Sequence, residues 1–381
     1  MNAWLMAVSL TATTVGVNGM PLYIDASQLG VKNEINEETL RENKLKISAE
    51  AKSYDVDEKG KITNYCGAET DIVIPNKKNG RQICEIGQDV FQNQQNIQSV
   101  IISEGITKIS QDAFFNCKSL KRVVVASTVT EIAVGAFRNC DSLEEIDLSK
   151  TSITKISESV FKNCKNLEKV ILPKGLLTIE ADAFMGCGQL ASINIEELEQ
   201  LNRIGSGAFG NCLSLTNIVI PESVTRIAGG AFANCMQLQT ITIPGRVSEF
   251  GQAVLAGIPQ VTIKGTINSL AHDYAREKKI DFEPVSEEIL VSKIELSGED
   301  ITLDEENIKK LNILAGEKLP VTVEVSKEAT DKNICWECNK EGIVEISEGG
   351  MVKGLKKGFV AVVVRAVGGV NKTDYMEINV I

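Results

Sequence analysis

Cysteine is the residue whose number and spacing most suggest chemistry in this chain. Six of its ten cysteines recur at intervals of 23 to 25 residues, at Cys117, Cys140, Cys164, Cys187, Cys212 and Cys235. A zinc site uses close cysteine pairs with a second pair nearby, and a disulfide needs Cβ atoms about 3.8 Å apart on converging side chains. Cysteines one repeat apart would instead be stacked about 4.8 Å apart with parallel side chains. The spacing therefore favours buried thiols that pack as small hydrophobic groups.

The remaining cysteines and the single histidine lie outside the repeated series. Cys335 and Cys338 form a C-x-x-C motif, but it follows a strand pattern and does not begin a helix, which disfavours a redox or metal role. Cys66 and Cys84 could pair if the chain is exported. His272 is the only histidine, which disfavours mechanisms built on imidazole. Because the phosphate-binding, zinc-protease and serine-nucleophile motifs are also missing from the sequence, we expect no catalytic residues, no metal ligands and no cofactor.

Length and composition limit the number of domains and the classes of molecule that the chain is expected to bind. A length of 381 residues favours about two or three domains. Lys and Arg number 40 against 51 Asp and Glu, a formal net charge of −11. Nucleic acid is bound mainly by Lys and Arg at phosphates, so an acidic chain argues against it, and an anionic membrane surface is disfavoured for the same reason. Acidic runs such as Asp304-Glu305-Glu306 lack the spacing of a calcium loop and are expected to be solvated.

The cysteines belong to a repeated phrase, Ala-Phe-x-Asn-Cys, whose period indicates a solenoid. Its Phe position, or the Leu that replaces it, falls at Phe91, Phe114, Phe137, Phe161, Phe184, Phe209, Phe232 and Leu255. An apolar pair three residues apart precedes each Phe, as in Ile106 and Ile109. A Leu six residues after most Phe positions opens a strand of the form Leu-x-x-Ile-x-Ile, as in residues 215–220.

One repeat cannot bury a core alone, so the copies must stack, with their strands forming a parallel sheet. We expect the Ala-Phe-x-Asn segment to form a short helical turn on the opposite face. The Asn of the phrase is expected to hydrogen-bond turn backbone between coils.

The sequence pattern predicts that the chain has four segments. Residues 1–26 are expected to be a signal peptide, because residues 1–24 carry no charge and contain an apolar stretch too short to span a bilayer; the alternative is a disordered or misread N-terminus. Residues 27–50 are expected to be a polar linker. Residues 51–285 are expected to be the solenoid, with a hairpin as N-terminal cap and a helix capped by Asn268-Ser269 near its end. Residues 286–381 alternate apolar and polar residues, which indicates a β-sandwich with Trp336 in its core.

Two resemblances follow from these motifs. The phrases Leu-x-x-Ile-x-Ile-Pro, Val-Thr-x-Ile and Ala-Phe-x-Asn-Cys-x-x-Leu resemble the BspA-type leucine-rich repeat of bacterial surface proteins over residues 50–285. The flanks Ile72-x-Ile74-Pro75 and Ser269-x-Ala271-x-x-Tyr274-Ala275 resemble its caps. Residues 290–381 are similar to group 2 bacterial immunoglobulin-like domains, on the residues Trp336, Val344-x-Ile346, Gly350-Met351-Val352, Gly358 and Val362. Cys335 and Cys338 stand where that family has hydroxyl residues.

Together the resemblances imply a mixed fold, a leucine-rich-repeat solenoid plus an all-β immunoglobulin-like sandwich, in a secreted or cell-surface protein. They imply adhesion without catalysis and do not name a ligand. The partner is expected to be an extracellular protein or a surface glycoconjugate, with no nucleic acid and no membrane insertion. The alternative function is a structural spacer or a cell-wall-associated module without a specific ligand.

The candidate binding surface is the outward face of the solenoid sheet, because repeat proteins commonly bind on this extended surface. The alternative is that its aliphatic residues suit a strand and its charges suit solubility. The predicted row comprises Ser99, Ile101, Arg122, Val124, Glu145, Asp147, Lys169, Ile171, Asn194, Asn217, Val219 and Thr242.

Overall fold

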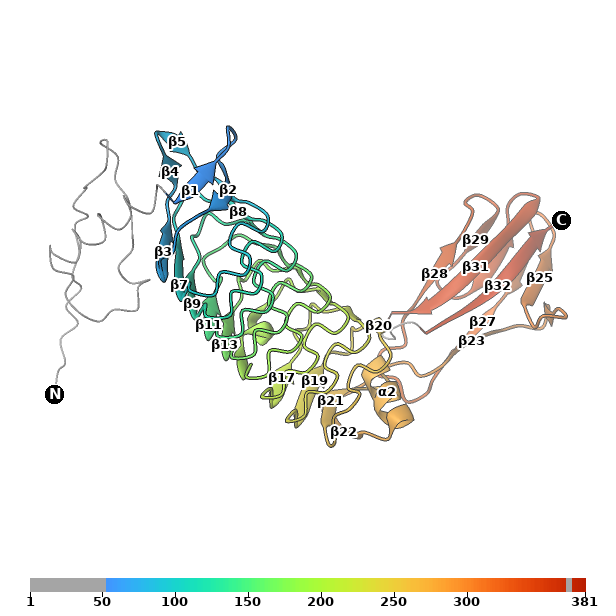
Figure 1. Ribbon diagram of the computed structural model, residues 1–381. Helices are drawn as coiled ribbons and strands as arrows, with labels where there is room; N and C mark the ends of the chain where they lie inside the picture. Colours follow the sequence, from blue (N-terminus) through green and yellow to red (C-terminus); the bar gives the residue numbers. More distant parts are fainter. Residues whose placement is uncertain (1–52, 368–371) are drawn as a thin grey trace, which may run out of the picture. The chain divides into compact units, whose positions relative to one another are not determined.

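The computed structural model describes residues 53–367 and 372–381 (Figure 1). The chain divides into two compact units. The first unit includes residues up to 153 together with 164–173, and the second includes 154–163 together with 174–381. The expected signal peptide (1–26) and linker (27–50) lie outside the described residues. In the part that is described, no helix is long and apolar enough to cross a membrane.

A hairpin begins the first unit, as the sequence predicts. Strand β1 (Tyr54–Val56) pairs antiparallel with β2 (Lys61–Tyr65), and the Oδ1 atom of Asp57 accepts the backbone N–H of Lys59 and of Lys61, each at 2.9 Å, within the turn. The rings of Tyr54 and Tyr65 lie 6.1 and 4.9 Å from the ring of Phe91. The hairpin therefore covers the apolar end of the first coil. A second, small hairpin follows, formed by β4 (Lys77–Lys78) and β5 (Arg81–Gln82).

The first unit contains two parallel ladders of strands. The strands of the first sheet were predicted, and they are β3 (Asp71–Ile74), β7 (Ser99–Ile102), β9 (Arg122–Val124), β11 (Glu145–Asp147) and β13 (Lys169–Ile171). The second sheet was not predicted. It continues from β2 through two-residue strands at the end of each apolar pair: β6 (Glu85–Ile86), β8 (Lys108–Ile109) and β10 (Glu131–Ile132).

The second unit repeats this plan. Its first sheet contains β17 (Asn217–Val219), β19 (Thr240–Ile243), β21 (Thr262–Ile267) and β22 (Asp281–Ile289), all parallel. A shorter strand, β15 (Ser192–Ile193), precedes a 3-10 helix, η2 (Ile195–Glu197). The second sheet contains β12 (Lys155–Ile156), β14 (Thr178–Ile179), β16 (Arg203–Ile204), β18 (Arg226–Ile227) and β20 (Glu249–Phe250).

Stacked phenylalanines and thiols fill the core of both units. In the second unit Phe184, Phe209 and Phe232 are fully buried, with successive ring centroids 5.3 and 5.2 Å apart. The predicted burial of the six repeated cysteines is confirmed. Each thiol also hydrogen-bonds the carbonyl of the Phe in the preceding coil, as Cys212 Sγ does to Phe184 at 3.3 Å. The Phe184 carbonyl also accepts the backbone N–H of Cys187 at 3.1 Å, so the thiol is a second donor to it and ties neighbouring coils together.

The Asn of the repeated phrase has a backbone role that was not predicted. Its backbone φ is positive in every copy, for example 60° at Asn116 and at Asn211, and Gly186 takes the same position with φ 77°. Asn and Gly are the residues that adopt this left-handed conformation at least cost. The side chains bond along the ladder, with Asn116 Nδ2 donating to Asn93 Oδ1 at 2.5 Å. The position is therefore selected mainly by backbone conformation, and a second pair of side chains, Asn234 Nδ2 and Asn211 Oδ1, bonds in the same way at 3.3 Å.

The predicted C-terminal cap helix is α2 (Leu270–Lys278). The side chain of Ser269 caps it by accepting the backbone N–H of His272 at 3.2 Å. The Nδ1 atom of His272 accepts the backbone N–H of Asn268 at 2.9 Å, and its ring lies 4.5 Å from that of Phe282. Tyr274 packs against Phe250, with centroids 4.9 Å apart. The single histidine is thus part of the cap.

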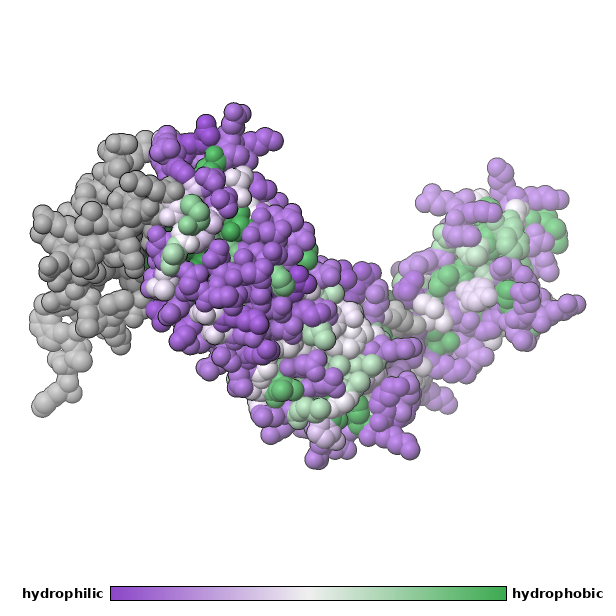
Figure 2. Space-filling model, viewed as in Figure 1, coloured by the Kyte–Doolittle hydropathy of each residue, from purple (hydrophilic) through white to green (hydrophobic). Residues whose placement is uncertain are grey.

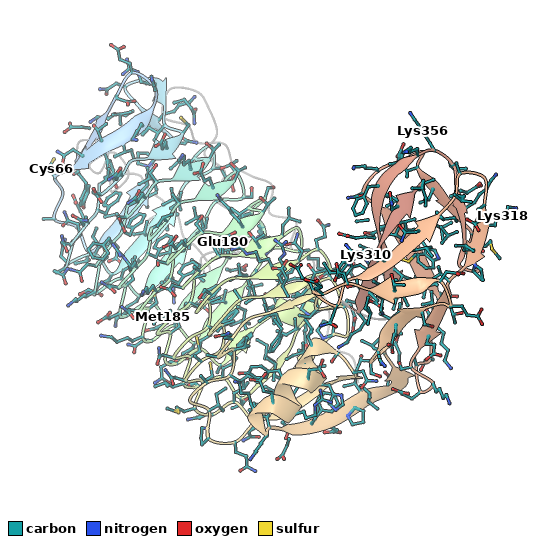
Figure 3. The ribbon with its side chains drawn as sticks, turned by 90° about the vertical axis from the view of Figure 1, so that its right-hand side faces the viewer. Cys66, Glu180, Met185, Lys310, Lys318 and Lys356 are labelled. Atoms are coloured by element: carbon teal, nitrogen blue, oxygen red, sulfur yellow. The ribbon has the colours of Figure 1, made fainter. Side chains whose placement is uncertain are left out.

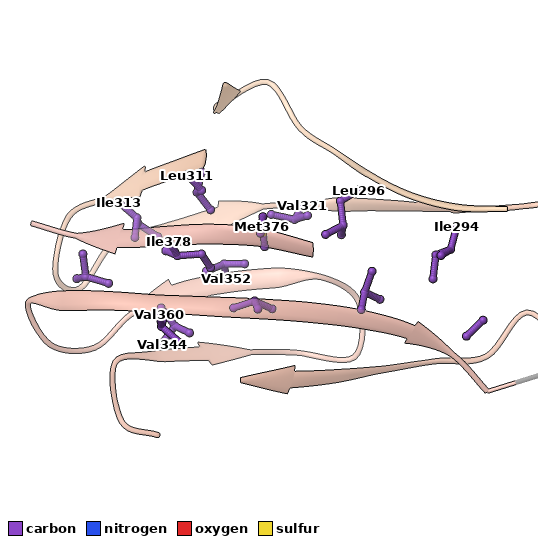
Figure 4. Close-up of a cluster of buried hydrophobic side chains, with 14 of the residues drawn as sticks. Ile294, Leu296, Leu311, Ile313, Val321, Val344, Val352, Val360, Met376 and Ile378 are labelled. Carbon is purple, nitrogen blue, oxygen red and sulfur yellow. The ribbon is translucent and has the colours of Figure 1, made fainter. Parts of the chain in front are cut away.

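Residues 290–367 and 372–381 contain β-strands around one apolar cluster, with strands on both sides of it (Figure 4). The sheet orders are β24-β25-β32-β31-β28, β26-β30-β29 and β23-β27, and all pairs are antiparallel except β25 with β32. The strands are β23 (Ile294–Ser297), β24 (Ile301–Leu303), β25 (Lys309–Ile313), β26 (Lys318–Pro320), β27 (Thr322–Val325), β28 (Ile334–Cys338), β29 (Val344–Ile346), β30 (Met351–Gly354), β31 (Gly358–Ala366) and β32 (Thr373–Val380).

The core of these strands is aliphatic, with Val352, Val360, Val362 and Ile378 fully buried. Trp336 packs against it and is half-buried, close to the position that the sequence predicts. Hydrophobic residues also remain visible on the outside of these strands (Figure 2).

Candidate functional site on the first sheet

The first-sheet face of the first unit presents two columns of outward side chains. Because alternate residues of a strand point to opposite faces, the intervening residues, such as Val100 and Ile146, are buried in the core. One column is polar and charged: Ser99, Arg122, Glu145 and Lys169. The other is mainly aliphatic: Ile101, Val124, Asp147 and Ile171. The structure thus brings all eight residues predicted for this unit onto one face.

A hollow of about 330 Å³ lies on this face. It is lined by Asp71, Gln98, Ser99, Val100, Ile101, Lys121, Arg122, Val124 and Glu144. Four of the predicted residues line it, while Gln98, Lys121 and Glu144 were missed because they precede the strands. The Oγ atom of Ser99 donates to Asp71 Oδ1 at 2.5 Å, which fixes one wall of the hollow. We call this feature the first-sheet hollow.

The charges beside the hollow alternate in sign on neighbouring strands but form no close ion pair with one another. Within the described residues, no ion pair of 4.0 Å or less involves Arg122, Glu145 or Lys169. On the second sheet of the same unit the opposite holds, since Lys108 Nζ lies 3.1 Å from Glu131 Oε1. A ligand at the first-sheet hollow would therefore meet charged groups without displacing an existing ion pair.

The second unit places its predicted residues differently. Asn217 and Val219 on β17 and Thr242 on β19 lie on the outward face, and Thr240 Oγ1 donates to Asn217 Oδ1 at 2.7 Å. A smaller hollow of about 220 Å³ has Asn217 and Val219 among its lining residues. On β17 and β19 this face carries hydroxyl and amide groups together with Val219, and the charged pair of Lys264 and Glu283, 3.1 Å apart, follows on β21 and β22.

Asn194 was predicted to belong to this row, and that prediction is wrong. It precedes η2 as its N-cap, with φ −83° and ψ 40°, and is not part of a strand. The interval from Phe184 to Phe209 is 25 residues, the longest of the series. The extra residues are taken up by η2, which ends β15 after two residues and removes Asn194 from the sheet.

The cysteines do not form a reactive site. Burial raises the pKa of Cys117 and of Cys235 to about 12, so both thiols hold their protons at neutral pH. Cys335 and Cys338 are three residues apart on β28, so their side chains point to opposite faces of the sheet. All ten cysteines lie in the described part of the chain, and all are free thiols. The same residues contain no group of three or more side chains arranged to hold a metal ion.

Two ladders of short parallel strands, joined by turns that stack a Phe in every coil, define a leucine-rich-repeat solenoid. The family model for the BspA-type leucine-rich repeat region matches residues 84–203 and 198–279, in six copies. These segments are just over half of the chain, which therefore belongs to the BspA-type leucine-rich repeat family. No curated protein matches the chain.

Solved structures with this repeat resemble parts of the chain. A leucine-rich repeat protein from Eubacterium ventriosum is 25% identical over 48% of this chain and 49% of its own, with a TM-score of 0.41. A leucine-rich cell surface protein from Faecalibacterium prausnitzii is 23% identical over 55% of this chain and 73% of its own, with a TM-score of 0.34. The leucine-rich repeat protein of T. pallidum is 22% identical over 60% of this chain and 94% of its own, with a TM-score of 0.36. The chain thus spans about half the length of the E. ventriosum protein.

Proposed function

We propose that this protein is a secreted or cell-surface binding protein that adheres to an extracellular protein or a surface glycoconjugate through the first-sheet hollow. The observation that carries the proposal is the position of Arg122, which forms no close ion pair among the described residues, beside an aliphatic column in a hollow of about 330 Å³. Membership of a family of repeat proteins supports binding over catalysis, since such proteins present extended surfaces. The description of the F. prausnitzii protein as a cell surface protein supports the location.

The chemistry of the hollow suits a ligand of mixed character. The guanidinium of Arg122 can hold a carboxylate or sulfate group with two parallel hydrogen bonds. Ile101 and Val124 offer apolar contact next to it, and Glu144 rejects a second anion. Binding sites generally combine a desolvated apolar contact with a few polar groups that fix orientation.

The rest of the chain is proposed to support this role. Residues 51–285 would be the binding solenoid with its caps, and residues 286–381 an immunoglobulin-like module that holds it away from the surface. The mainly antiparallel strands around the cluster of Val352, Val360 and Ile378 favour such a module. Residues 1–26 would direct export, and residues 27–50 would connect them to the solenoid.

Binding of the full chain to immobilised matrix proteins and to intact host cells tests the proposal. The double substitution Arg122→Glu with Lys169→Glu is expected to weaken saturable binding at least about tenfold. The matched control, Lys155→Glu with Arg226→Glu, makes the same change in net charge on the second sheet and is expected to leave binding within about twofold. Equal losses in both variants would refute the assignment to the hollow. If the folded wild-type chain binds none of the surfaces, the protein is better explained as a spacer.

A further inference from the structure

Strand β28 lies at the end of its sheet, and only β31 pairs with it. The pairing is regular from Ile334 opposite Ala366 to Cys338 opposite Val362, without a bulge. One long side of a five-residue strand is therefore left without a neighbour. An edge of this kind presents backbone groups that can pair with another chain.

The hydrogen bonds that flank the strand show which backbone groups are unpaired. Val367 donates its N–H to the carbonyl of Asn333 at 2.8 Å, and Asn339 donates to Ala361 at 3.1 Å. Because hydrogen-bonded residues alternate along an antiparallel pair, the odd-numbered residues of β28 bond to β31. The N–H and C=O groups of Ile334, Trp336 and Cys338 consequently point away from the sheet, and no described residue bonds to them.

Other end strands near β28 carry the features that protect natural sheet edges. Strand β26 has Lys318 and Pro320 among its three residues, and β24 and β29 are also only three residues long. On β23 the backbone N–H of Leu296 is bonded to Asp374 at 2.7 Å. Strand β28 is longer and contains no lysine, no proline and no bulge. By these criteria it is more open to pairing than β23, β24, β26 or β29.

The groups beside β28 indicate what would occupy the edge. Only an extended backbone offers donors and acceptors at the matching spacing. Lys332 and Lys340 flank the strand, and each Nζ bonds a backbone carbonyl, of Lys327 at 2.8 Å and of Phe359 at 3.1 Å. Among the described residues, neither forms an ion pair of 4.0 Å or less with a carboxylate. Antiparallel pairing of two copies centred on Trp336 would place Lys332 of one copy opposite Lys340 of the other, and like charges in that position are destabilising.

We propose that the outer edge of β28 binds an extended polypeptide segment from another protein, with acidic residues at both ends and an uncharged centre. The segment adds a strand to the sheet through the backbone groups of Ile334, Trp336 and Cys338. Its terminal carboxylates pair with Lys332 and Lys340. This site lies on the C-terminal strands and is independent of the first-sheet hollow.

Amide hydrogen exchange on the full chain tests the proposal. The probes are two short peptides with the same alternating Val-Thr centre, one with Asp-Asp at each end and the other with Lys-Lys at each end. The acidic peptide is expected to slow exchange at the amides of Ile334, Trp336 and Cys338 at least about tenfold, which corresponds to about 1.4 kcal/mol. The basic peptide is expected to leave them unchanged. Equal protection by both peptides, or by neither, would overturn the proposal.

Two sets of variants separate edge pairing from other causes. Cys338→Pro removes a donor that points outward, so the ladder with β31 is retained while the added strand loses a bond. Cys338→Ala is its matched control and is expected to bind the acidic peptide as the wild type does. Lys332→Glu with Lys340→Glu is expected to abolish the protection, whereas Lys356→Glu, in the turn between β30 and β31 (Figure 3), is expected to preserve it.

Three results in these variants would contradict the proposal. Binding of the acidic peptide by Cys338→Pro as tight as by Cys338→Ala would exclude backbone pairing at this edge. Binding unaffected by the paired Lys→Glu changes would exclude the acidic ends. Protection that appears without peptide and rises with protein concentration would show that a second copy occupies the edge.

Discussion

Alkaline pH is expected to unfold the solenoid through its buried thiols. Burial raises the pKa of Cys117 and Cys235 from the ordinary value of 9.0 to about 12, and it also raises the pKa of Cys140 and Cys212. The unfolded chain loses these protons near pH 9, whereas the folded chain holds them to about pH 12. The stability contributed by the thiols is therefore complete below pH 9 and is lost as the pH rises.

The size of the effect follows from the difference between the folded and unfolded pKa values. Well above pH 9, each pH unit costs about 1.4 kcal/mol per buried thiol. At pH 10, Cys117 and Cys235 together are expected to lower the free energy of unfolding by about 3 kcal/mol. That is a large part of the roughly 5–15 kcal/mol that a folded domain has in total.

Urea unfolding followed by circular dichroism between pH 7 and pH 10 measures this loss. The variant Cys117→Ala with Cys235→Ala should be less stable than the wild type at pH 7, because it loses buried atoms and two thiol hydrogen bonds. It should nevertheless lose about 3 kcal/mol less than the wild type between pH 8 and pH 10. The same dependence on pH in both proteins would refute the assignment to these thiols.

Two further substitutions test the core and the turn of the repeat by thermal unfolding. Phe209→Ala removes a fully buried ring that stacks on two neighbours, and it is expected to lower the free energy of unfolding by about 4 kcal/mol. Phe209→Leu is expected to lower it by less than half as much. Similar losses in both variants would argue against a contribution from stacking. Asn211→Ala places a residue with a Cβ atom at φ 60°, where only Gly and Asn fit at low cost. It is expected to lower the free energy of unfolding by about 1 kcal/mol more than Asn211→Gly does. The reverse order would contradict selection of this position by backbone conformation.

The regular part of the solenoid could be predicted because one sequence motif recurs many times and marks the same buried positions in each repeat. Each full copy puts a Phe and a Cys in the core, and a strand such as β17 places Ile218 inward between the outward Asn217 and Val219. A wrong assignment of core residues in one copy would have conflicted with the spacing of the other copies. The caps could be predicted for a related reason, since Tyr65 and Tyr274 are large apolar residues placed where the repeats end.

The second sheet could not be predicted in the same way. A strand such as Lys108–Ile109 has one outward and one inward residue, which is too short to show a period of two. Its pattern in the sequence is only an apolar pair three residues apart, and that spacing is equally typical of a turn or a helix. The alternation in charge of Glu85, Lys108 and Glu131, in register on neighbouring strands, was the signal that could have revealed it.

The conformation of the repeated Asn could have been inferred from its substitution pattern. Gly186 replaces it in one copy, and Asn and Gly share little except tolerance of a positive φ. The prediction that Asn194 lies on a strand was wrong because the local pattern Ile193-x-Ile195 still resembles a strand. Only the longer interval between Phe184 and Phe209 signals the 3-10 helix that replaces it.

The contrast between the two sheets of the first unit decides which face is better suited to a ligand. On the second sheet, Lys61 lies 3.0 Å from Glu85 and Lys108 lies 3.1 Å from Glu131, so a charged ligand would have to compete with these pairs. Such exposed pairs contribute at most about 1 kcal/mol each, so their main effect is to neutralise that face. On the first sheet the charge of Arg122 is left without a partner among the described residues, beside aliphatic side chains and a hollow. A ligand carboxylate there would meet Arg122 without displacing an ion pair, and this difference is why the charge substitutions on the first sheet should weaken binding.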